Sequence, residues 1–121
     1  DSHLKFLSKY SHYFSLPKQN PKAYTCWLAF PMIVKKDAHF SRTDMQIFLE
    51  KRNIQTRVVF TGNVLRQPMM KNVKYVGNAD DFVNADRVLK QGILLACHHG
   101  LHNAMIDHLY QSIDLFIEQY I

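Results

Sequence analysis

The sequence predicts an α+β fold in which a small, mostly antiparallel sheet packs with helices. Two observations favour this class. Apolar residues recur at three- and four-residue spacings near both ends of the chain, whereas short apolar runs bounded by turn residues lie between them. The 121 residues are 47% apolar and 21% charged, which is typical of one globular domain, residues 1–121, with a sizeable core.

The first expected elements are a helix and a strand. Helical spacing of apolar side chains predicts a helix over residues 3–14, followed by a loop between Pro17 and Pro21. An apolar run predicts a strand over residues 24–34. Pro31 interrupts this run and cannot donate a backbone hydrogen bond, so we expect it at a sheet edge or a bulge.

A capping box predicts the second helix. Ser41 and, three residues later, Asp44 form the pattern of an N-cap pair that begins a helix over residues 42–52. Asn53 is a typical left-handed stop for such a helix. Three apolar side chains of this helix are expected in the core: Met45, Phe48 and Leu49.

The middle of the chain is expected to be extended. Residues 55–60 predict a strand whose apolar part, Val58–Phe60, is buried. Residues 73–76 predict a short strand, and residues 77–80 a turn.

Three further elements complete the expected order of helix, strand, helix, strand, short strand, helix, strand and helix. Asn84 is expected to cap a helix over residues 85–91, which Gly92 ends. A fully apolar strand is expected over residues 93–97, and a final helix over residues 103–120. This last helix is expected to bury one apolar face: Ile106, Leu109, Tyr110, Ile113, Phe116, Ile117 and Tyr120.

The segment from Thr56 to Pro68 is the most informative part of the chain. It leads from the apolar strand into the turn pair Gly62–Asn63, and Pro68 stops further pairing. It carries four hydrogen-bond donors, expected on one loop-rich face suited to an anion or a sugar: Arg57, Asn63, Arg66 and Gln67. An ordinary surface loop is the alternative that composition alone leaves open.

His98–His99 is a second candidate, because adjacent residues after a buried strand point to opposite sides. We expect one of the two imidazoles to approach the donors of residues 57–67; the alternative is a strand-end turn with satisfied imidazoles. His102 and His108 are six residues apart, so they do not form the two-ligand face of a metalloprotease helix. The isolated histidines are expected at the surface: His3, His12 and His39.

Several classes of site find no support. Cys26 and Cys97 lie in apolar runs without metal-ligand spacing, so we expect no metal site and two reduced core residues of a cytoplasmic protein. The patterns G-x-S-x-G and G-x-G-x-x-G do not occur, so no complete catalytic machinery is recognised. The net charge of +5 is scattered, so no nucleic-acid partner is expected, and no apolar stretch is long enough to span a membrane.

The motif T-R-x-x-F-x-G-N-x-x-R-Q-P, from Thr56 to Pro68, resembles the DegT/StrS-type nucleotide-sugar aminotransferases and dehydratases, which use pyridoxal phosphate. Within that family it is most similar to the 3-dehydratases that make 3,6-dideoxysugars for lipopolysaccharide. Other segments resemble the family in the same order: residues 27–31, 40–50, 53–57, 84–88 and 93–101.

This resemblance implies the small C-terminal domain of a fold-type I pyridoxal-phosphate enzyme. Its large N-terminal domain, which would bind the cofactor and hold the reactive Lys or His, would lie outside the chain. The fragment alone is therefore expected to be inactive and to bind no pyridoxal phosphate. The implied partners are that N-terminal domain, a nucleotide sugar and a second copy in a homodimer; whether an iron–sulfur centre takes part is not decided by these residues.

The resemblance places no catalytic residue in this chain. The implied substrate-binding residues are Arg57, Phe60, Gly62, Asn63, Arg66, Gln67, His98 and His99.

Two features favour one reaction. Amine-transferring members commonly have His before the aromatic residue at the strand end, where this chain has Val59. Together with Gly62–Asn63, this favours 3-dehydration of a CDP- or GDP-linked 4-keto-6-deoxyhexose, with the small domain positioning the substrate. The alternatives are C4 aminotransfer on the same scaffold and a stand-alone basic binding module.

Overall fold

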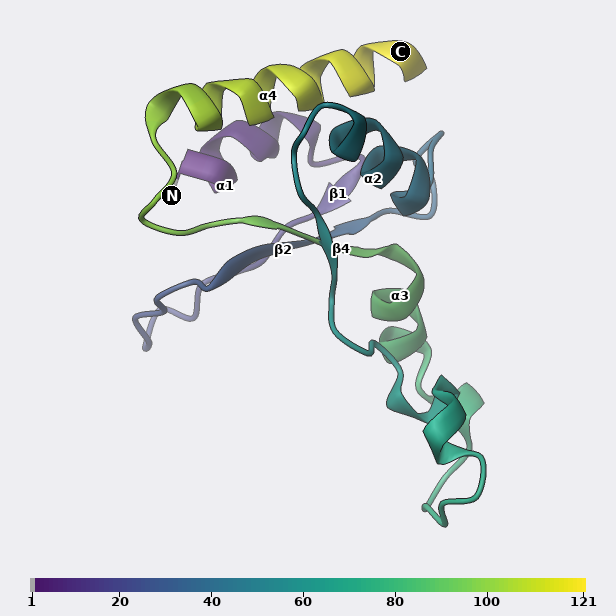
Figure 1. Ribbon diagram of the computed structural model, residues 1–121. Coiled ribbons are helices and arrows are strands. Elements are labelled where there is room, and N and C mark those ends of the chain that lie inside the picture. Colours follow the sequence, from purple (N-terminus) through teal and green to yellow (C-terminus); the bar gives the residue numbers. More distant parts are fainter. Residues whose placement is uncertain (1) are drawn as a thin grey trace.

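Four short strands form one antiparallel sheet in the computed structural model, which describes residues 2–121 (Figure 1). The strands lie in the order β1-β2-β4-β3, and each neighbouring pair is antiparallel. Their bounds are β1 (Phe14–Ser15), β2 (Ala29–Val34), β3 (Arg57–Val58) and β4 (Gly92–Ala96). The predicted α+β class, with a mostly antiparallel sheet, is confirmed.

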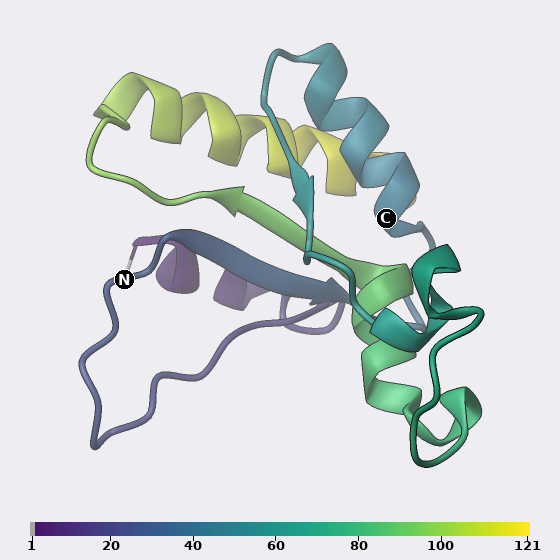
Figure 2. The same ribbon diagram turned by 60° about the horizontal axis from the view of Figure 1, so that its bottom comes forward.

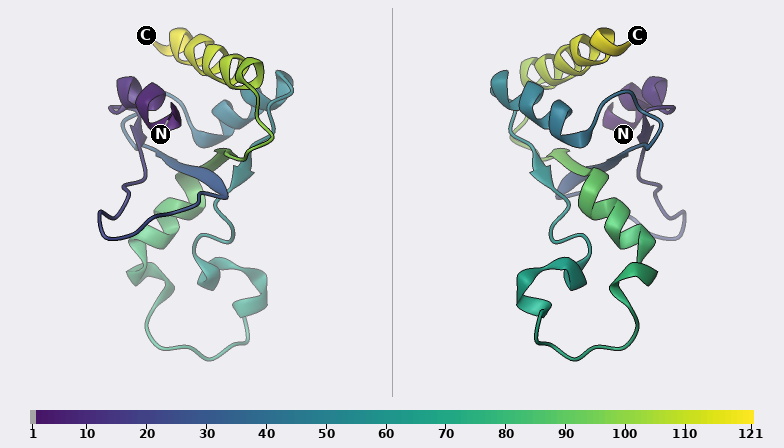
Figure 3. Two further views of the ribbon diagram at one scale, coloured as in Figure 1. Left: turned by 90° about the vertical axis from the view of Figure 1, so that its left-hand side faces the viewer. Right: turned by 90° about the vertical axis from the view of Figure 1, so that its right-hand side faces the viewer.

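Helices cover one face of this sheet and extend past its end. α1, α2 and α4 lie on one side of the sheet, whereas α3 points away from it (Figures 1 and 3). The α-helices are α1 (Ser2–Leu7), α2 (Arg42–Lys51), α3 (Val83–Gln91) and α4 (Asn103–Ile117). Short 3-10 helices are η1 (Ser8–Tyr10), η2 (Val64–Arg66), η3 (Pro68–Met70), η4 (Ala79–Asp81) and η5 (Glu118–Tyr120).

The core lies between the sheet and α1, α2 and α4. Strand β2 alternates, with Phe30, Met32 and Val34 buried and the intervening residues half-buried. The core also contains apolar side chains from β4 and the helices: Leu7, Met45, Leu49, Ile93, Leu95, Leu109, Ile113, Phe116 and Ile117. Of the predicted core residues of α2 and the last helix, four pack half-buried against this core or remain partly exposed: Phe48, Ile106, Tyr110 and Tyr120.

Pro31 takes the edge position that its missing N–H requires. The backbone N–H of Lys35 donates to the Tyr13 carbonyl oxygen at 2.7 Å, so that side of β2 faces β1. Because N–H directions alternate along a strand, the nitrogen of Pro31 faces the same side. The β1 pairing ends at Ile33, so Pro31 lies beyond it and no ladder hydrogen bond is lost.

Local signals for α2 are confirmed. Ser41 Oγ accepts from the Asp44 N–H at 3.2 Å, and the Asp44 carboxylate accepts from the Ser41 N–H at 2.8 Å. These hydrogen bonds from Ser41 hold the pKa of Asp44 below its usual range. Asn53 has φ 60°, the left-handed conformation expected of a helix stop.

Polar contacts fix α4 to the other layers. Arg52 Nε donates to Ser112 Oγ at 2.8 Å. The His3 ring lies 2.8 Å from Tyr110 Oη through Nδ1 and 2.9 Å from the Ala96 carbonyl oxygen through Nε2. The surface position predicted for His3 is wrong, because its side chain is 6% exposed and joins α1, α4 and β4.

Three predicted elements are shorter than expected or absent. The helix predicted over residues 3–14 ends with η1, because Phe14 pairs with Val34 in the sheet instead of continuing the helical face. The strand predicted over residues 24–34 begins at Ala29, where the β4 partner ends. Residues 73–76 are exposed and have no strand partner within residues 2–121, so the predicted short strand does not form.

The start of α3 also differs from its prediction. Asn84 lies inside the first turn, and Phe82 is the N-cap, with its carbonyl oxygen accepting from the Asp86 N–H at 3.0 Å. Gly92 ends the helix as predicted and begins β4 directly. The predicted helix end and strand are therefore confirmed, whereas the predicted cap is wrong.

Truncation of α2 provides a test of this packing. Leu49 is 0% exposed, whereas Ile47 on the same helix is 51% exposed. Leu49→Ala should lower the free energy of unfolding by about 2–5 kcal/mol, because it leaves a cavity. Ile47→Ala, the matched control, should change it by about 0.5 kcal/mol or less. Equal losses for the two variants in urea unfolding would contradict this description of the core.

Candidate functional site

Residues 59–67, here called the Phe60 loop, leave the sheet at its edge strand. Strand β3 pairs with β4 alone, with Arg57 opposite Leu94 and Val58 opposite Ile93. Val58 is 45% exposed and Phe60 is 82% exposed. The prediction that Val58–Phe60 is buried is therefore wrong for Val58 and Phe60, because a two-residue edge strand has a neighbour on one side only; Val59 is half-buried.

The residue that precedes β3 is firmly anchored to α2. Thr56 is 5% exposed, and its N–H and Oγ1 both donate to Glu50 Oε1, at 2.7 and 3.0 Å. These hydrogen bonds from Thr56, and to a smaller extent the charge of Arg57, lower the pKa of Glu50. The end of α2 thus fixes where the segment enters the sheet edge.

Two left-handed residues shape the turn. Phe60 has φ 39° and Gly62 has φ 57°. A side chain at Gly62 would overlap the backbone of Leu89 in α3, so this position requires glycine for its conformation and for its close approach. Phe60 lacks the conformational freedom of glycine, so its positive φ is strained and persists only because its surroundings hold it there.

The side chain of Asn63 holds the loop in this conformation. It is 2% exposed, and its Oδ1 accepts from the Leu65 N–H at 3.1 Å. Its Nδ2 donates to Asp86 Oδ1 at 2.7 Å and to the Ala79 carbonyl oxygen at 3.3 Å. One buried amide therefore joins the loop to η4 and to α3.

Arg66 completes this network with two carboxylates. Its Nε and Nη2 donate to Asp86 at 3.1 and 2.8 Å, and Nη2 also donates to Asp80 at 2.6 Å. Hydrogen bonds from Arg66 and Asn63 lower the pKa of Asp86 to about 2, and the same carboxylates raise the pKa of Arg66. Arg66 is thus engaged within the chain.

The four predicted donors divide into two groups. Asn63 and Arg66 share one network, and Gln67 Nε2 donates to the Thr61 carbonyl oxygen at 3.1 Å within the same loop. Arg57 lies outside this network on the exposed edge strand. Among the large apolar side chains of this loop, that of Phe60 is the most exposed, at 82%.

His98–His99 lies at the other end of β4. Val59 packs near Gly92, where β4 begins, whereas the histidines follow Ala96, where it ends. Figures 1 and 2 show the segment after β3 and the β4–α4 connection leaving opposite ends of the sheet. The prediction that an imidazole approaches the donors of residues 57–67 is wrong. His98 Nδ1 instead accepts from the Gly100 N–H at 3.1 Å and orders its own turn.

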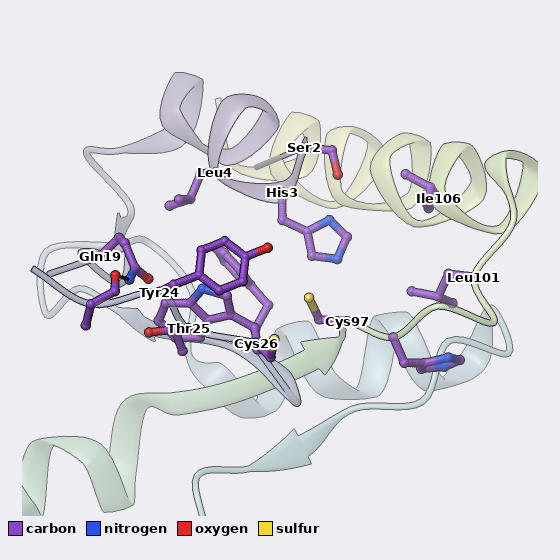
Figure 4. Close-up of a pocket in the computed structure, with 14 residues that line it drawn as sticks. Ser2, His3, Leu4, Gln19, Tyr24, Thr25, Cys26, Cys97, Leu101 and Ile106 are labelled. Atoms are coloured by element: carbon purple, nitrogen blue, oxygen red, sulfur yellow. Dashed lines mark hydrogen bonds between the residues drawn. The ribbon is translucent and has the colours of Figure 1, made fainter. Parts of the chain in front are cut away.

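A hollow of about 450 Å³ adjoins this turn, between α1, the 16–28 loop and the start of α4 (Figure 4). Cys97 and His3 face it, and Cys26 lies on its loop side. Cys26 is exposed and Cys97 half-buried, so the prediction of two core cysteines is wrong for Cys26. The 16–28 segment lacks strand pairing, which is why its apolar run does not bury this side chain.

The sequence patterns missed three contributors to the Phe60 loop. Asp80 and Asp86 resemble helix caps and solvated charges, and Leu89 resembles an ordinary helix residue. Their roles depend on contacts between residues 14 to 27 positions apart in the sequence, and no local pattern marks them.

Within residues 2–121, no group of three or more His, Cys, Asp or Glu side chains is arranged to hold a metal ion. None of the helices within residues 2–121 combines the length and the apolar composition that a membrane span requires.

Comparison with known sequences matches residues 6–114 to the DegT/DnrJ/EryC1/StrS aminotransferase family. The chain is 35% identical over 102 residues to dTDP-4-dehydro-2,6-dideoxy-D-glucose 3-dehydratase of Saccharopolyspora spinosa, covering 84% of this chain and 22% of that protein. It is 30% identical over 112 residues to lipopolysaccharide biosynthesis protein RfbH of Salmonella typhimurium, covering 91% of this chain and 25% of that protein. The chain thus spans about a quarter of the length of these relatives.

Solved structures have the same fold. GDP-4-keto-6-deoxy-D-mannose-3-dehydratase of E. coli, solved with hydrated PLP, has a TM-score of 0.69 and 28% identity, over 88% of this chain and 28% of that one. An aminotransferase from Psychrobacter cryohalolentis has a TM-score of 0.80 over 97% of this chain and 32% of that one. Its identity is 14%, so this likeness concerns the fold alone. The predicted family resemblance is confirmed.

The Asp86 network makes the stability of the chain depend on acid pH. Because the pKa of Asp86 falls from 3.8 to about 2 on folding, its stabilisation is full above about pH 4 and is lost as the pH falls towards 2. Asp86→Asn should therefore destabilise the chain at pH 6, and the difference from wild type should shrink between about pH 4 and pH 2. Thermal or urea unfolding across this range measures it.

Asp107→Asn is the matched control, because it removes one exposed carboxylate from α4 without touching the network. A wild-type to Asp86→Asn difference that stays constant from pH 6 to pH 2 would contradict the assigned role of Asp86.

Proposed function

Because the chain belongs to the DegT/DnrJ/EryC1/StrS aminotransferase family, we propose that it is the substrate-positioning small domain of a pyridoxal-phosphate-dependent nucleotide-sugar enzyme. In this proposal it forms the C-terminal part of a longer protein, since it spans about a quarter of its relatives. The remainder of the enzyme supplies the large domain. The full-length protein acts as a homodimer in the cytoplasm.

The observation that carries this proposal is the way in which Phe60 is displayed. A large apolar side chain that is 82% exposed gains nothing from folding, and its positive φ adds a cost. Buried Asn63 and close-packed Gly62 nevertheless hold it in place. Strain maintained by a built network is typical of positions that contact a ligand or another domain.

Phe60 would contribute a flat apolar face against a sugar ring or base, and Arg57 a charged donor beside it. Gly62, Asn63, Arg66 and Gln67 would act by fixing the loop. His98 and His99 enter the proposal as a separate contact region at the far end of β4, with His98 ordering the turn and His99 exposed.

The residues of the Phe60 loop do not fit pyridoxal phosphate itself. The phosphate of the cofactor requires unengaged donors, whereas Arg66, the cation of residues 59–67, is already bound by Asp80 and Asp86. That segment also contains no lysine. We therefore place the cofactor in the part of the enzyme outside this chain and expect residues 1–121 alone not to retain it.

We propose 3-dehydration of a CDP- or GDP-linked 4-keto-6-deoxyhexose as the reaction, within lipopolysaccharide biosynthesis. Two of the relatives above at 28% identity or more are named 3-dehydratases, and a third is named a lipopolysaccharide biosynthesis protein. Val59 supports the same choice. Its apolar side chain packs near Gly92, at the position where amine-transferring members that the chain resembles commonly have His. The competing reaction is C4 aminotransfer.

Product analysis decides between these reactions. The full-length enzyme should convert a 4-keto-6-deoxy sugar nucleotide, with glutamate as amine source, into a product that has lost the C3 hydroxyl. Mass spectrometry and NMR of the product provide the measurement. A stable 4-amino sugar with its C3 hydroxyl intact, as the main product, would overturn the dehydratase assignment.

A further inference from the structure

A second hollow, of about 530 Å³, lies between the end of β2 and the outer face of α3. Lys35 and Lys36 line it from the residues that follow β2, and Arg87 and Lys90 line it from α3. This face of α3 is next to the face that carries Leu89, which contacts the Phe60 loop, and Asp86 lies between the two. The hollow is therefore beside the loop and separate from it.

The hollow is strongly cationic. Within residues 2–121, the ammonium groups of Lys35, Lys36 and Lys90 form no ion pair. Of the two lining carboxylates, Asp86 is already bound by Arg66, which leaves Asp37 to oppose four cations. Arg87 uses one nitrogen to donate to Ser15 Oγ at 3.2 Å, and its guanidinium has further donors.

Gln91 gives the hollow a second chemical feature. Its Oε1 is buried and accepts no hydrogen bond from any residue within 2–121. A buried acceptor without a partner is uncommon in a folded chain, so the Gln91 amide would gain a hydrogen bond if it turned its oxygen towards a hydroxyl group of a ligand in the hollow. The hollow is thus lined both by cations that can bind an anion and by Gln91, whose amide oxygen lacks a hydrogen-bond donor.

We propose that this hollow binds a diphosphate group carried by a hydroxylated ligand. A diphosphate offers adjacent anionic oxygens to cations on two sides of the hollow, and a ribose or sugar hydroxyl would donate to Gln91 Oε1 once the amide turns towards the hollow. The choice of a nucleotide sugar as the source rests on the proposed function, whereas the diphosphate chemistry rests on the hollow. No aromatic side chain lines the hollow, so stacked single-stranded nucleic acid does not fit it.

Titration calorimetry of the 121-residue chain tests this site with inorganic phosphate, inorganic diphosphate and CDP. We expect CDP and diphosphate to bind more tightly than phosphate, and added salt to weaken each. Lys90→Ala and Arg87→Ala should each raise the dissociation constant for diphosphate about tenfold. Lys71→Ala, which removes an exposed lysine outside the hollow, should leave it unchanged.

Gln91→Leu separates the two halves of the proposal. It should weaken CDP and spare inorganic diphosphate, because the latter lacks a ribose hydroxyl. Circular dichroism melting of each variant verifies that the fold is kept.

The site would be overturned, whatever reaction the full-length enzyme performs, if diphosphate did not bind. It would also be overturned if Lys71→Ala lowered the affinity for diphosphate as much as Lys90→Ala and Arg87→Ala do. If diphosphate binds but Gln91→Leu leaves the dissociation constant for CDP unchanged, the proposed contact between a ligand hydroxyl and Gln91 would be overturned. Failure of the dehydratase assignment is measured separately, by the product formed.

Discussion

The candidate site depends on the buried amide of Asn63. A side chain that is 2% exposed must satisfy both its donor and its acceptor, since an unpaired buried polar group costs about 1–3 kcal/mol. Its partners are the Leu65 N–H, the Ala79 carbonyl oxygen and the Asp86 carboxylate. Satisfying one amide therefore positions the Phe60 loop, η4 and α3 together.

The sheet supports this network through α3, which leads directly into β4. β4 is one of the two interior strands, and α3 joins it at Gly92 without a loop, so the position of α3 is set by a strand that packs in the core. One face of α3 receives Gly62 and Asn63, and the next face lines the cationic hollow. A site supported by packed elements keeps its geometry better than a free loop does.

Local chemistry was predictable from the sequence, and long-range chemistry was not. Ser41 with Asp44, and the left-handed Asn53, act through neighbours within a few positions, so their patterns identified them correctly. The resemblance directed attention to Thr56 to Pro68, but it could not show that Arg66 is bound by Asp80 and Asp86. Apolar runs misled where a partner strand was missing, as at residues 24–28 and 73–76. His98–His99 was misplaced because strand order, which the sequence pattern does not give, sets which ends meet.

A double-mutant cycle in the full-length enzyme tests most directly whether the network acts by presenting Phe60 to the substrate. The variants are Phe60→Ala, Asn63→Ala and the pair, and the quantity compared is kcat/KM on a 4-keto-6-deoxy sugar nucleotide, with melting temperatures to verify folding. If Asn63 acts through Phe60, its loss should lower kcat/KM in the wild-type background and have little further effect once Phe60 is gone. Independent, additive losses, or no loss from Phe60→Ala, would contradict this role for the loop.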